Sequence, residues 1–226
     1  MAAAMAPKEP PTSVTHSAEG RRPLTPTLRR RLPHAVVIFA ALLPLAWLGV
    51  AALRGGLGAN PIETISHTTG EWTLRLLLLT LAVTPARRLL SLAWLAPLRR
   101  TLGLLTFVYA TLHMLAYVGL DQLFEWASLV EDFVERRYVT AGLVAWLCLL
   151  PLALTSTRAS MKRLGRRWVK LHRLVYVAAV AAIVHYVWLV KADLAPPLAH
   201  AALLALLLGL RIRRKPAAVE RAAPVR

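Results

Sequence analysis

The stretch LHRLVYVAAVAAIVHYVWLVK, from Leu171 to Lys191, determines the class of protein that this sequence describes. Its central seventeen residues, 174–190, carry no formal charge, which is typical of a helix that crosses a lipid bilayer. Two histidines, His172 and His185, lie in it thirteen residues apart. Because a histidine in hydrocarbon is costly unless its ring nitrogens have partners, the stretch also raises the question of what these two imidazoles bind.

Outward from this stretch, five further apolar runs follow the same pattern. A bilayer core of about 30 Å needs about 20 apolar residues in a helix. With the opening stretch, the sequence predicts six spans: 35–53, 72–85, 101–120, 138–157, 171–190 and 194–210, of which the second and the sixth are short. Hydrophobic residues make up 57% of the chain, more than in an average soluble domain. The predicted fold class is therefore an all-α integral membrane protein with a six-transmembrane-helix bundle.

The basic residues are distributed unequally between the two sides of this bundle. If the N-terminus is cytoplasmic, 23 of the 28 lysines and arginines fall on the cytoplasmic side, and eight of the 11 acidic residues fall on the other. Cytoplasmic loops of membrane proteins carry such a basic excess, so the sequence predicts that both termini are cytoplasmic. Basic loops that face anionic lipid then explain the net charge of +17, and no nucleic-acid partner is expected.

This topology divides the chain into three parts. Residues 1–33 form a basic N-terminal segment that we expect to be disordered. Residues 34–212 form the six-helix domain, and residues 213–226 form a basic cytoplasmic tail. The first apolar run is too long for the core of a signal peptide, so we expect it to remain in the protein as a helix.

Candidate ligands have to be sought among the histidines. The single cysteine, Cys148, excludes an intrachain disulfide and a cysteine-based metal cluster. His16 is expected in the N-terminal segment, His34 at the cytoplasmic end of the first run and His67 in an outer loop, and histidines in such exposed positions are usually solvated. His200, in the sixth run, is either a spare ligand or a polar residue that packs between helices. The remaining three are His113, His172 and His185.

His113 and His185 are predicted to lie at nearly equal depth in the membrane. At a rise of about 1.5 Å per residue, His113 lies about 18 Å along its span and His185 about 21 Å along its own, and both spans run outward. Two imidazoles so placed on parallel helices can hold an iron porphyrin, with one axial nitrogen from each side. The alternative is that both are polar core residues bonded to backbone or threonine.

His172 lies about 20 Å from His185 along the helix axis, near the cytoplasmic face. The third run has no histidine at the corresponding depth, near Arg100, so a second bis-histidine haem lacks its second ligand there. His172 could ligate a second haem alone, contact a quinone or flavin, or cap a helix end. One haem in the outer half leaves a gap of roughly 20 Å to the cytoplasmic face, which is the reason to expect a second cofactor near His172.

Two charged features on the outer side are further candidates. Arg75 lies at the depth of the predicted haem edge and could pair with a propionate, with snorkelling to the interface as the alternative. The outer loop 121–137 is a candidate docking surface for a partner protein, or is simply solvated. It carries five carboxylates: Asp121, Glu125, Glu131, Asp132 and Glu135.

Several segments of the chain resemble a known family. They are GANPIE (58–63), RLLLLTLAVTPARR (75–88), RRTLGLL (99–105), YATLHMLAYV (109–118) and LALTSTRASMKRLGRRWVKLHRLVY (152–176). In this order they are similar to the haem-binding membrane subunits of bacterial periplasmic methionine sulfoxide reductase systems, the MsrQ (formerly YedZ) family of the ferric-reductase-like transmembrane group. The resemblance runs from about residue 34 to about residue 212, nearly the whole chain apart from its tails.

The resemblance implies a multi-pass protein of the bacterial inner membrane that transfers electrons across it. Electrons would come from the quinone pool or a cytoplasmic flavin reductase and pass through haem b to a periplasmic molybdopterin-containing catalytic subunit that reduces methionine sulfoxide in oxidised proteins. The family's histidines match His113, His172 and His185. FMN, which the family is also described as binding, is expected from the resemblance alone.

Two rival functions make different predictions. A stand-alone transmembrane ferric or quinone reductase would need no protein partner. A transporter that uses His113, His172 and His185 as a proton or metal path would show no visible absorption and no haem requirement.

Overall fold

The computed structural model describes residues 26–212, and every regular element within them is helical, as predicted. The six longest helices are α1 (Pro26–Leu53), α2 (Pro61–Leu89), α3 (Leu98–Leu115), α5 (Arg137–Leu154), α8 (Leu174–Leu189) and α9 (Ala195–Ile212). The shorter elements are η1 (Ala93–Leu95), η2 (Ala116–Asp121), α4 (Trp126–Glu135), α6 (Arg158–Leu164) and α7 (Arg166–Leu171).

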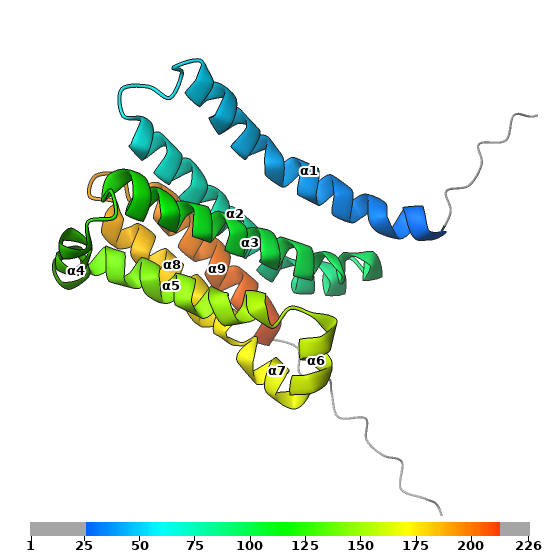
Figure 1. Cartoon of the computed structure of the whole chain (residues 1–226). Coiled ribbons are helices and arrows are strands. Elements are labelled where there is room, and N and C mark those ends of the chain that lie inside the picture. Colours follow the sequence, from blue (N-terminus) through cyan, green and yellow to red (C-terminus); the bar gives the residue numbers. More distant parts are fainter. Residues whose placement is uncertain (1–25, 213–226) are drawn as a thin grey trace, which may run out of the picture.

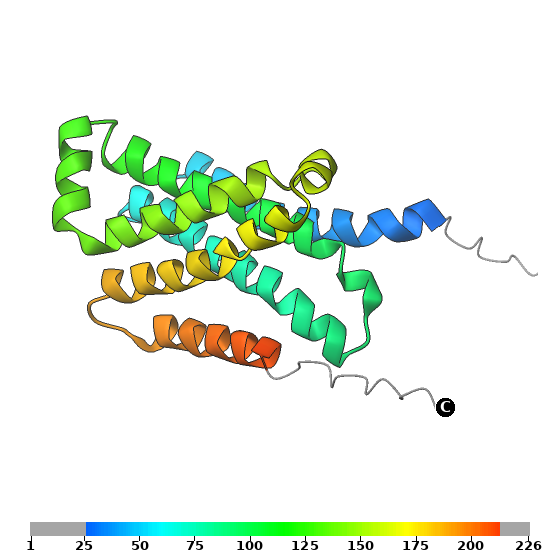
Figure 2. The same ribbon diagram turned by 90° about the horizontal axis from the view of Figure 1, so that it is seen from below.

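The long helices run back and forth between the two ends of one bundle (Figures 1 and 2). Helix α4 lies at one end, and α6 and α7 lie at the other. The described chain begins and ends at the α6–α7 end (Figure 1). Helices α3 and α8 run in the same direction, as the sequence predicted for the two histidine-bearing spans.

Four helical segments are long and apolar enough to cross a membrane: Arg31–Leu53, Ala93–Asp121, Arg137–Leu154 and Arg166–Leu189. They correspond to the first, third, fourth and fifth predicted spans. The segment Ala195–Arg211 is a shorter apolar helix. Helix α2 is not among the four, and it carries charged residues along its length, including Glu71 and Arg75.

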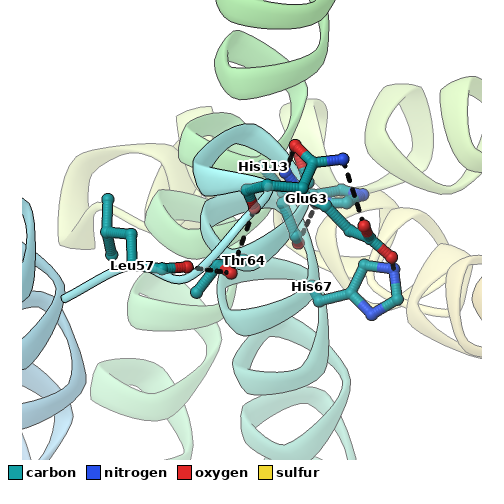
Figure 3. Close-up of polar contacts among 7 residues, drawn as sticks. Leu57, Glu63, Thr64, His67 and His113 are labelled. Atoms are coloured by element: carbon teal, nitrogen blue, oxygen red, sulfur yellow. Dashed lines mark hydrogen bonds and ion pairs between the residues drawn. The ribbon is translucent and has the colours of Figure 1, made fainter. Parts of the chain in front are cut away.

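Helix α2 begins eleven residues before the start of the predicted second span. Asn60 caps it, because its side-chain oxygen accepts a hydrogen bond from the Glu63 backbone N–H at 3.3 Å, and Pro61 suits the first helical position. His67 therefore lies on a helix beside Glu63 and not in an outer loop, which corrects the sequence expectation (Figure 3).

The start of α1 differs from the sequence prediction as well. Residues 26–33, which were expected to belong to the disordered N-terminal segment, form the first turns of this helix. Pro26 suits a first helical turn because its missing N–H would have no partner there. The rest of that segment, residues 1–25, and the predicted tail 213–226 lie outside the described residues.

The bundle is built from two closely packed helix pairs, α2 with α3 and α5 with α8. They meet in one core that includes Leu77, Leu81, Ala178 and Ala179, all almost fully buried. The two alanines on α8 allow helices to approach closely, as small residues do in membrane bundles. Helix α1 packs mainly on α3 and is held there by Tyr109, whose hydroxyl donates to the backbone oxygen of Ala41.

A hydrogen bond from the Arg211 side chain joins helix α9 to α2. Pro85 lies inside α2 and has no N–H, so the carbonyl of Leu81, one turn earlier, lacks its helical donor. The Arg211 guanidinium donates to this carbonyl and, at 2.6 Å, to the hydroxyl of Tyr176. A side chain from another helix therefore satisfies a backbone group that proline leaves without its helical partner.

Candidate functional site

The structure brings His113 of α3 and His185 of α8 into contact, as their predicted depths required. Their ring centroids lie 6.0 Å apart and their planes are inclined at 79°. The two residues are 72 positions apart in the sequence, so only the packing of the two helix pairs places them together.

Each imidazole is oriented by a backbone carbonyl of the helix on which it packs. His113 Nδ1 lies 2.9 Å from the Ser66 oxygen on α2, and His185 Nδ1 lies 2.7 Å from the Tyr138 oxygen on α5. A carbonyl can only accept, so in both rings Nδ1 carries the proton and donates. Nε2 is then the nitrogen with a free lone pair, and a hydrogen bond from the other ring nitrogen to a backbone carbonyl is typical of a metal-binding histidine.

Glycines make room for both rings. A Cβ atom on Gly70 would lie 3.0 Å from Cε1 of His113, and one on Gly142 would lie 2.9 Å from Nδ1 of His185. Real Cβ atoms scarcely approach other atoms this closely, so an alanine at either position would displace the imidazole. Glycine is needed here for close approach and not for an unusual backbone conformation.

The two halves of the site repeat one another. The second set follows the first by 72 residues: Ser66, Gly70 and His113 correspond to Tyr138, Gly142 and His185. The carbonyls and glycines were not predicted from the sequence. One feature of the sequence could have revealed them. The glycine of TTG (68–70) lies 43 residues before His113, and the glycine of TAG (140–142) lies 43 residues before His185.

The chemistry of this donor set suits haem better than a bare metal ion. Residues 26–212 contain no group of three or more His, Cys, Asp or Glu side chains that could hold an ion. A porphyrin supplies four nitrogens itself and needs only axial ligands. The ring centroids, 6.0 Å apart, are close enough for both imidazoles to contact one bound group.

His172 occupies a different environment at the α6–α7 end. It is the C-cap of α7, its ring stacks on Trp168 at 3.7 Å between centroids, and its Nδ1 lies 3.1 Å from the Trp168 backbone oxygen. The helix-capping role left open by the sequence is thus present. Its Nε2, however, is buried without a hydrogen bond, and Arg211 Nε is the other such side-chain atom among the described residues.

A small pocket opens beside His172. Its volume is about 210 Å³, and Arg99, Arg100 and Trp168 line it together with His172. Its lining includes no carboxylate. The volume is below the roughly 300–1,000 Å³ of sites that enclose a whole drug-sized ligand, so the pocket suits one end of a cofactor, in particular an anionic end.

The other predicted candidates have partners within the protein. Arg75 forms an ion pair with Glu71 on the same helix, and its guanidinium lies 5.1 Å from the Trp72 ring centroid. His200 Nδ1 lies 2.7 Å from the Pro196 backbone oxygen, and its ring packs edge-on against Tyr186. His200 therefore packs between helices, one of its two predicted roles.

The predicted acidic loop contains helix α4, and its five carboxylates differ in exposure. Asp132 is buried and accepts hydrogen bonds from Tyr117 at 2.7 Å and from Gln122 at 2.9 Å. It therefore does not belong to an exposed docking surface, which corrects that part of the prediction. The remaining four are exposed: Asp121, Glu125, Glu131 and Glu135.

Comparison with known proteins gives one consistent family. Residues 69–183, which include His113 and both glycines and end two residues before His185, match the ferric reductase like transmembrane component. Three relatives are named protein-methionine-sulfoxide reductase heme-binding subunit MsrQ. The protein from Rhodospirillum rubrum is 51% identical over 81% of this chain and 89% of its own. The protein from Caulobacter vibrioides is 45% identical over 86% and 94%, and that from Xanthomonas campestris pv. campestris (strain B100) is 46% identical over 78% and 84%.

No solved structure matches the chain. The likeness to the relatives covers about four fifths of the chain, and it agrees with the apolar helices. The chain is therefore a multi-pass membrane protein that belongs to the ferric-reductase-like transmembrane family and, within it, to the MsrQ family.

Proposed function

We propose that this protein is the haem b-containing electron-transfer subunit of a protein-methionine-sulfoxide reductase in the bacterial inner membrane. The observation that carries the proposal is the pair of imidazoles at 6.0 Å, each with Nδ1 on a carbonyl and Nε2 available. The names of the relatives, which describe heme-binding subunits, support it.

Haem bound between His113 and His185 would supply one-electron transfer. The protein's own residues orient the ligands and exclude water. The carbonyls of Ser66 and Tyr138 fix the tautomer and rotation of the two rings and make Nε2 a better donor. Apolar side chains of the shared core, such as the partly buried Ala182 one turn before His185, keep the surroundings of low polarity, which tunes a redox potential.

Six spans with both termini in the cytoplasm complete the proposed topology. Helices α2 and α9 would be the second and sixth spans of the 34–212 domain, because they run alongside the four apolar segments between the same two ends (Figure 2). The α6–α7 end would be cytoplasmic, since the basic residues gather there. The α4 end would then be periplasmic.

A second cofactor is proposed at His172, on the cytoplasmic side. The unpartnered Nε2 and the two arginines of the pocket favour a group with an anionic end: a second haem, a flavin such as FMN, or the head of a quinone. Such a group would bridge the roughly 20 Å to the His113–His185 pair. It would accept electrons from the quinone pool or from a cytoplasmic flavin reductase.

Arg75 is proposed to offset the charge of a haem propionate, in competition with its partner Glu71. It lies on α2 five residues after Gly70, the residue that touches the His113 ring.

The proposed electron acceptor is a periplasmic molybdopterin-containing catalytic subunit. The exposed carboxylates at the α4 end are the candidate surface for docking it.

A reduced-minus-oxidised visible spectrum of the detergent-purified protein, with haem and flavin quantified per chain, tests the proposal. We expect a sharp b-type α band with at least one haem per chain. Absence of haem after expression with added haem precursor would overturn the electron-transfer function. The stoichiometry identifies the group at His172: a second haem, one flavin, or neither if that group is an exchangeable quinone.

A second assay separates the proposal from the stand-alone reductase. Vesicles that contain the reduced protein are supplied with a methionine-sulfoxide substrate, with and without the periplasmic catalytic subunit, or with a soluble ferric chelate. We expect sulfoxide-dependent reoxidation only with the catalytic subunit. Rapid reoxidation by the ferric chelate alone, together with no response to the subunit, would favour the stand-alone ferric reductase.

A further inference from the structure

Helix α4 has a row of large apolar side chains that residues 26–212, the described part of the chain, leave uncovered. Trp126 is 72% exposed, Val130 is 62% exposed and Val134 is 80% exposed. Their spacing of four residues places them along one side of the helix. Such a continuous apolar row on a helix at the end of a membrane bundle requires an apolar environment.

The residues of α4 fall on three separate faces. At about 100° per residue, the apolar row, the acidic pair Glu131 and Glu135, and the buried side with Leu129 and Asp132 are centred roughly 120° apart. Leu129 and Asp132 are 3% and 6% exposed and face the bundle. One of the two free faces is therefore apolar and the other is acidic.

The rotation of α4 about its own axis is fixed by Asp132. Its carboxylate accepts from the Tyr117 hydroxyl at 2.7 Å and from the Gln122 amide at 2.9 Å, and it forms an ion pair with Arg136 at 3.0 Å. Tyr117 belongs to the η2 segment that precedes α4, so the bond joins α4 to the end of a candidate membrane span.

The apolar row continues into the surface of two membrane spans. Val134 lines a groove of about 710 Å³ together with Val144 of α5 and Val177, Val180 and Trp188 of α8. Both helices belong to segments long and apolar enough to cross a membrane, so the outer surface that carries this groove faces lipid. The apolar face of α4 is thus continuous with a lipid-facing surface.

The turn that leads into α4 adds two more exposed apolar side chains. Leu123 and Phe124 have φ values of 47° and 60°, a left-handed conformation that is rare for bulky residues. They are nonetheless 76% and 57% exposed. A strained turn that presents a leucine and a phenylalanine to solvent would be unfavourable in water, but it is readily explained beside lipid.

We propose that α4 is an interfacial helix that lies on the membrane surface, with the phospholipid bilayer as its partner. Its Trp126–Val130–Val134 side enters the boundary between headgroups and acyl chains, and its Glu131 and Glu135 side faces water. Trp126 at this depth matches the preference of tryptophan for membrane interfaces. The inference depends on the chain being a membrane protein and is independent of the proposed haem function.

Spin labels on neighbouring residues of α4 test the proposal. Val130→Cys and Val134→Cys would be made in a Cys148→Ser background, with Glu131→Cys and Glu135→Cys as matched controls one residue away. All four positions are exposed, so labelling should not disturb the fold. The full chain would be reconstituted in phosphatidylethanolamine–phosphatidylglycerol vesicles, and collisions of each label with oxygen and with a water-soluble nickel complex would be measured.

We expect the labels at 130 and 134 to collide several times more with oxygen than with nickel, and the labels at 131 and 135 to show the reverse. Equal access of nickel to all four positions would overturn the proposal, because α4 would then be in water. Exclusion of both reagents from 130 and 134 would overturn it as well, because a second copy or another protein would then cover the face. Circular dichroism and elution of each variant as a single species control for folding.

Discussion

The imidazoles of His113 and His185 are held by a neighbouring helix, whereas the imidazole of His172 is held by its own segment. At the pair, each Nδ1 bonds a carbonyl 47 residues away in the sequence. At His172, Nδ1 bonds the carbonyl four residues earlier. The pair therefore depends on how two helix pairs pack, while His172 depends on local structure and on whatever fills its pocket.

The largest effect is expected from removing either ligand of the pair. His113→Ala or His185→Ala should abolish haem binding, because one remaining imidazole cannot provide both axial bonds. His172→Ala should lower total haem or flavin only in part and leave the b-type band of the pair. Pyridine haemochrome and flavin assays of the purified variants measure this.

Full haem loading in the His185→Ala protein would contradict the ligand assignment. Complete loss of haem in the His172→Ala protein, if it still elutes as a folded species, would mean that the His113–His185 site and the His172 site form a single unit. Circular dichroism of each variant is the control, since a misfolded bundle would lose haem for a trivial reason.

The next largest effect is expected at Gly70 and Gly142, the glycines that make room for the imidazoles of His113 and His185. Gly142→Ala and Gly70→Ala should weaken haem binding by about 1–3 kcal/mol, the usual range for overpacking, or roughly 5- to 150-fold in affinity. The two effects should be similar, because the added Cβ would lie 2.9 Å from a ring atom at Gly142 and 3.0 Å from one at Gly70. Haem titration of the apoprotein measures the change.

Gly49→Ala is the matched control for the glycine variants. This glycine also lies on a helix of the bundle, α1, but a Cβ there would meet nothing within 4 Å. Equal weakening by Gly49→Ala and Gly142→Ala would show that the bundle tolerates no added methyl group, and would remove the special role of the glycine–histidine contacts.

A third prediction concerns Arg211, whose Nε, like Nε2 of His172, forms no hydrogen bond within the part of the chain that the structure describes. Arg211→Gln should destabilise the protein by about 1–3 kcal/mol, because the Leu81 carbonyl loses its donor. Pro85→Ala restores an N–H to α2, so the same substitution should cost less in that background. The coupling between the two substitutions is measured by thermal unfolding in detergent of four proteins: the unmodified protein, the two single variants and the double variant.

Zero coupling between Arg211→Gln and Pro85→Ala would contradict the pairing of the guanidinium with the carbonyl. The hydroxyl of Tyr176, the second acceptor of Arg211, offers a comparison. Tyr176→Phe should weaken the protein by less than Arg211→Gln does, because it leaves the Leu81 carbonyl satisfied.

The smallest effect is expected at the exposed Glu71–Arg75 pair. Arg75→Gln should lower the midpoint potential of the haem, since it removes a positive charge that favours the reduced form, and Glu71→Gln should raise it. An exposed charge contributes at most about 1 kcal/mol, which for one electron is about 40 mV. Potentiometric titration measures the shifts, and shifts of equal sign would exclude Arg75 from the haem edge.

The fold was predicted best where the chain is uninterrupted and apolar. The run 138–157 corresponds to α5 and the run 101–120 to α3 with η2, within a few residues at each end. The length of α2 was underestimated because Glu63 and Glu71 break the apolar pattern, although the Asn60–Pro61 cap was visible in the sequence. Helix α4 was missed because its acidic residues are typical of a loop.

Of the site, only the approach of His113 to His185 was predicted, because it follows from the depth of each residue along its helix. Helical rise placed His113 and His185 at one level, and the structure brings their rings together. The carbonyls of Ser66 and Tyr138 and the two glycines act through tertiary packing, which a single run of residues does not encode. Comparison of the chain with itself at a shift of 72 residues would have found them.

The division of the site between two helix pairs has a consequence for biosynthesis. Gly70 and His113 are synthesised before Gly142 and His185. A nascent chain that ends ahead of α8 therefore carries the half of the site with Gly70 and His113 but lacks His185. Helices can insert into a bilayer singly or in pairs and associate afterwards. If haem binds between His113 and His185, as proposed, it can be bound by both imidazoles only after α8 has been translated and inserted, so haem loading is a late step in the maturation of this protein.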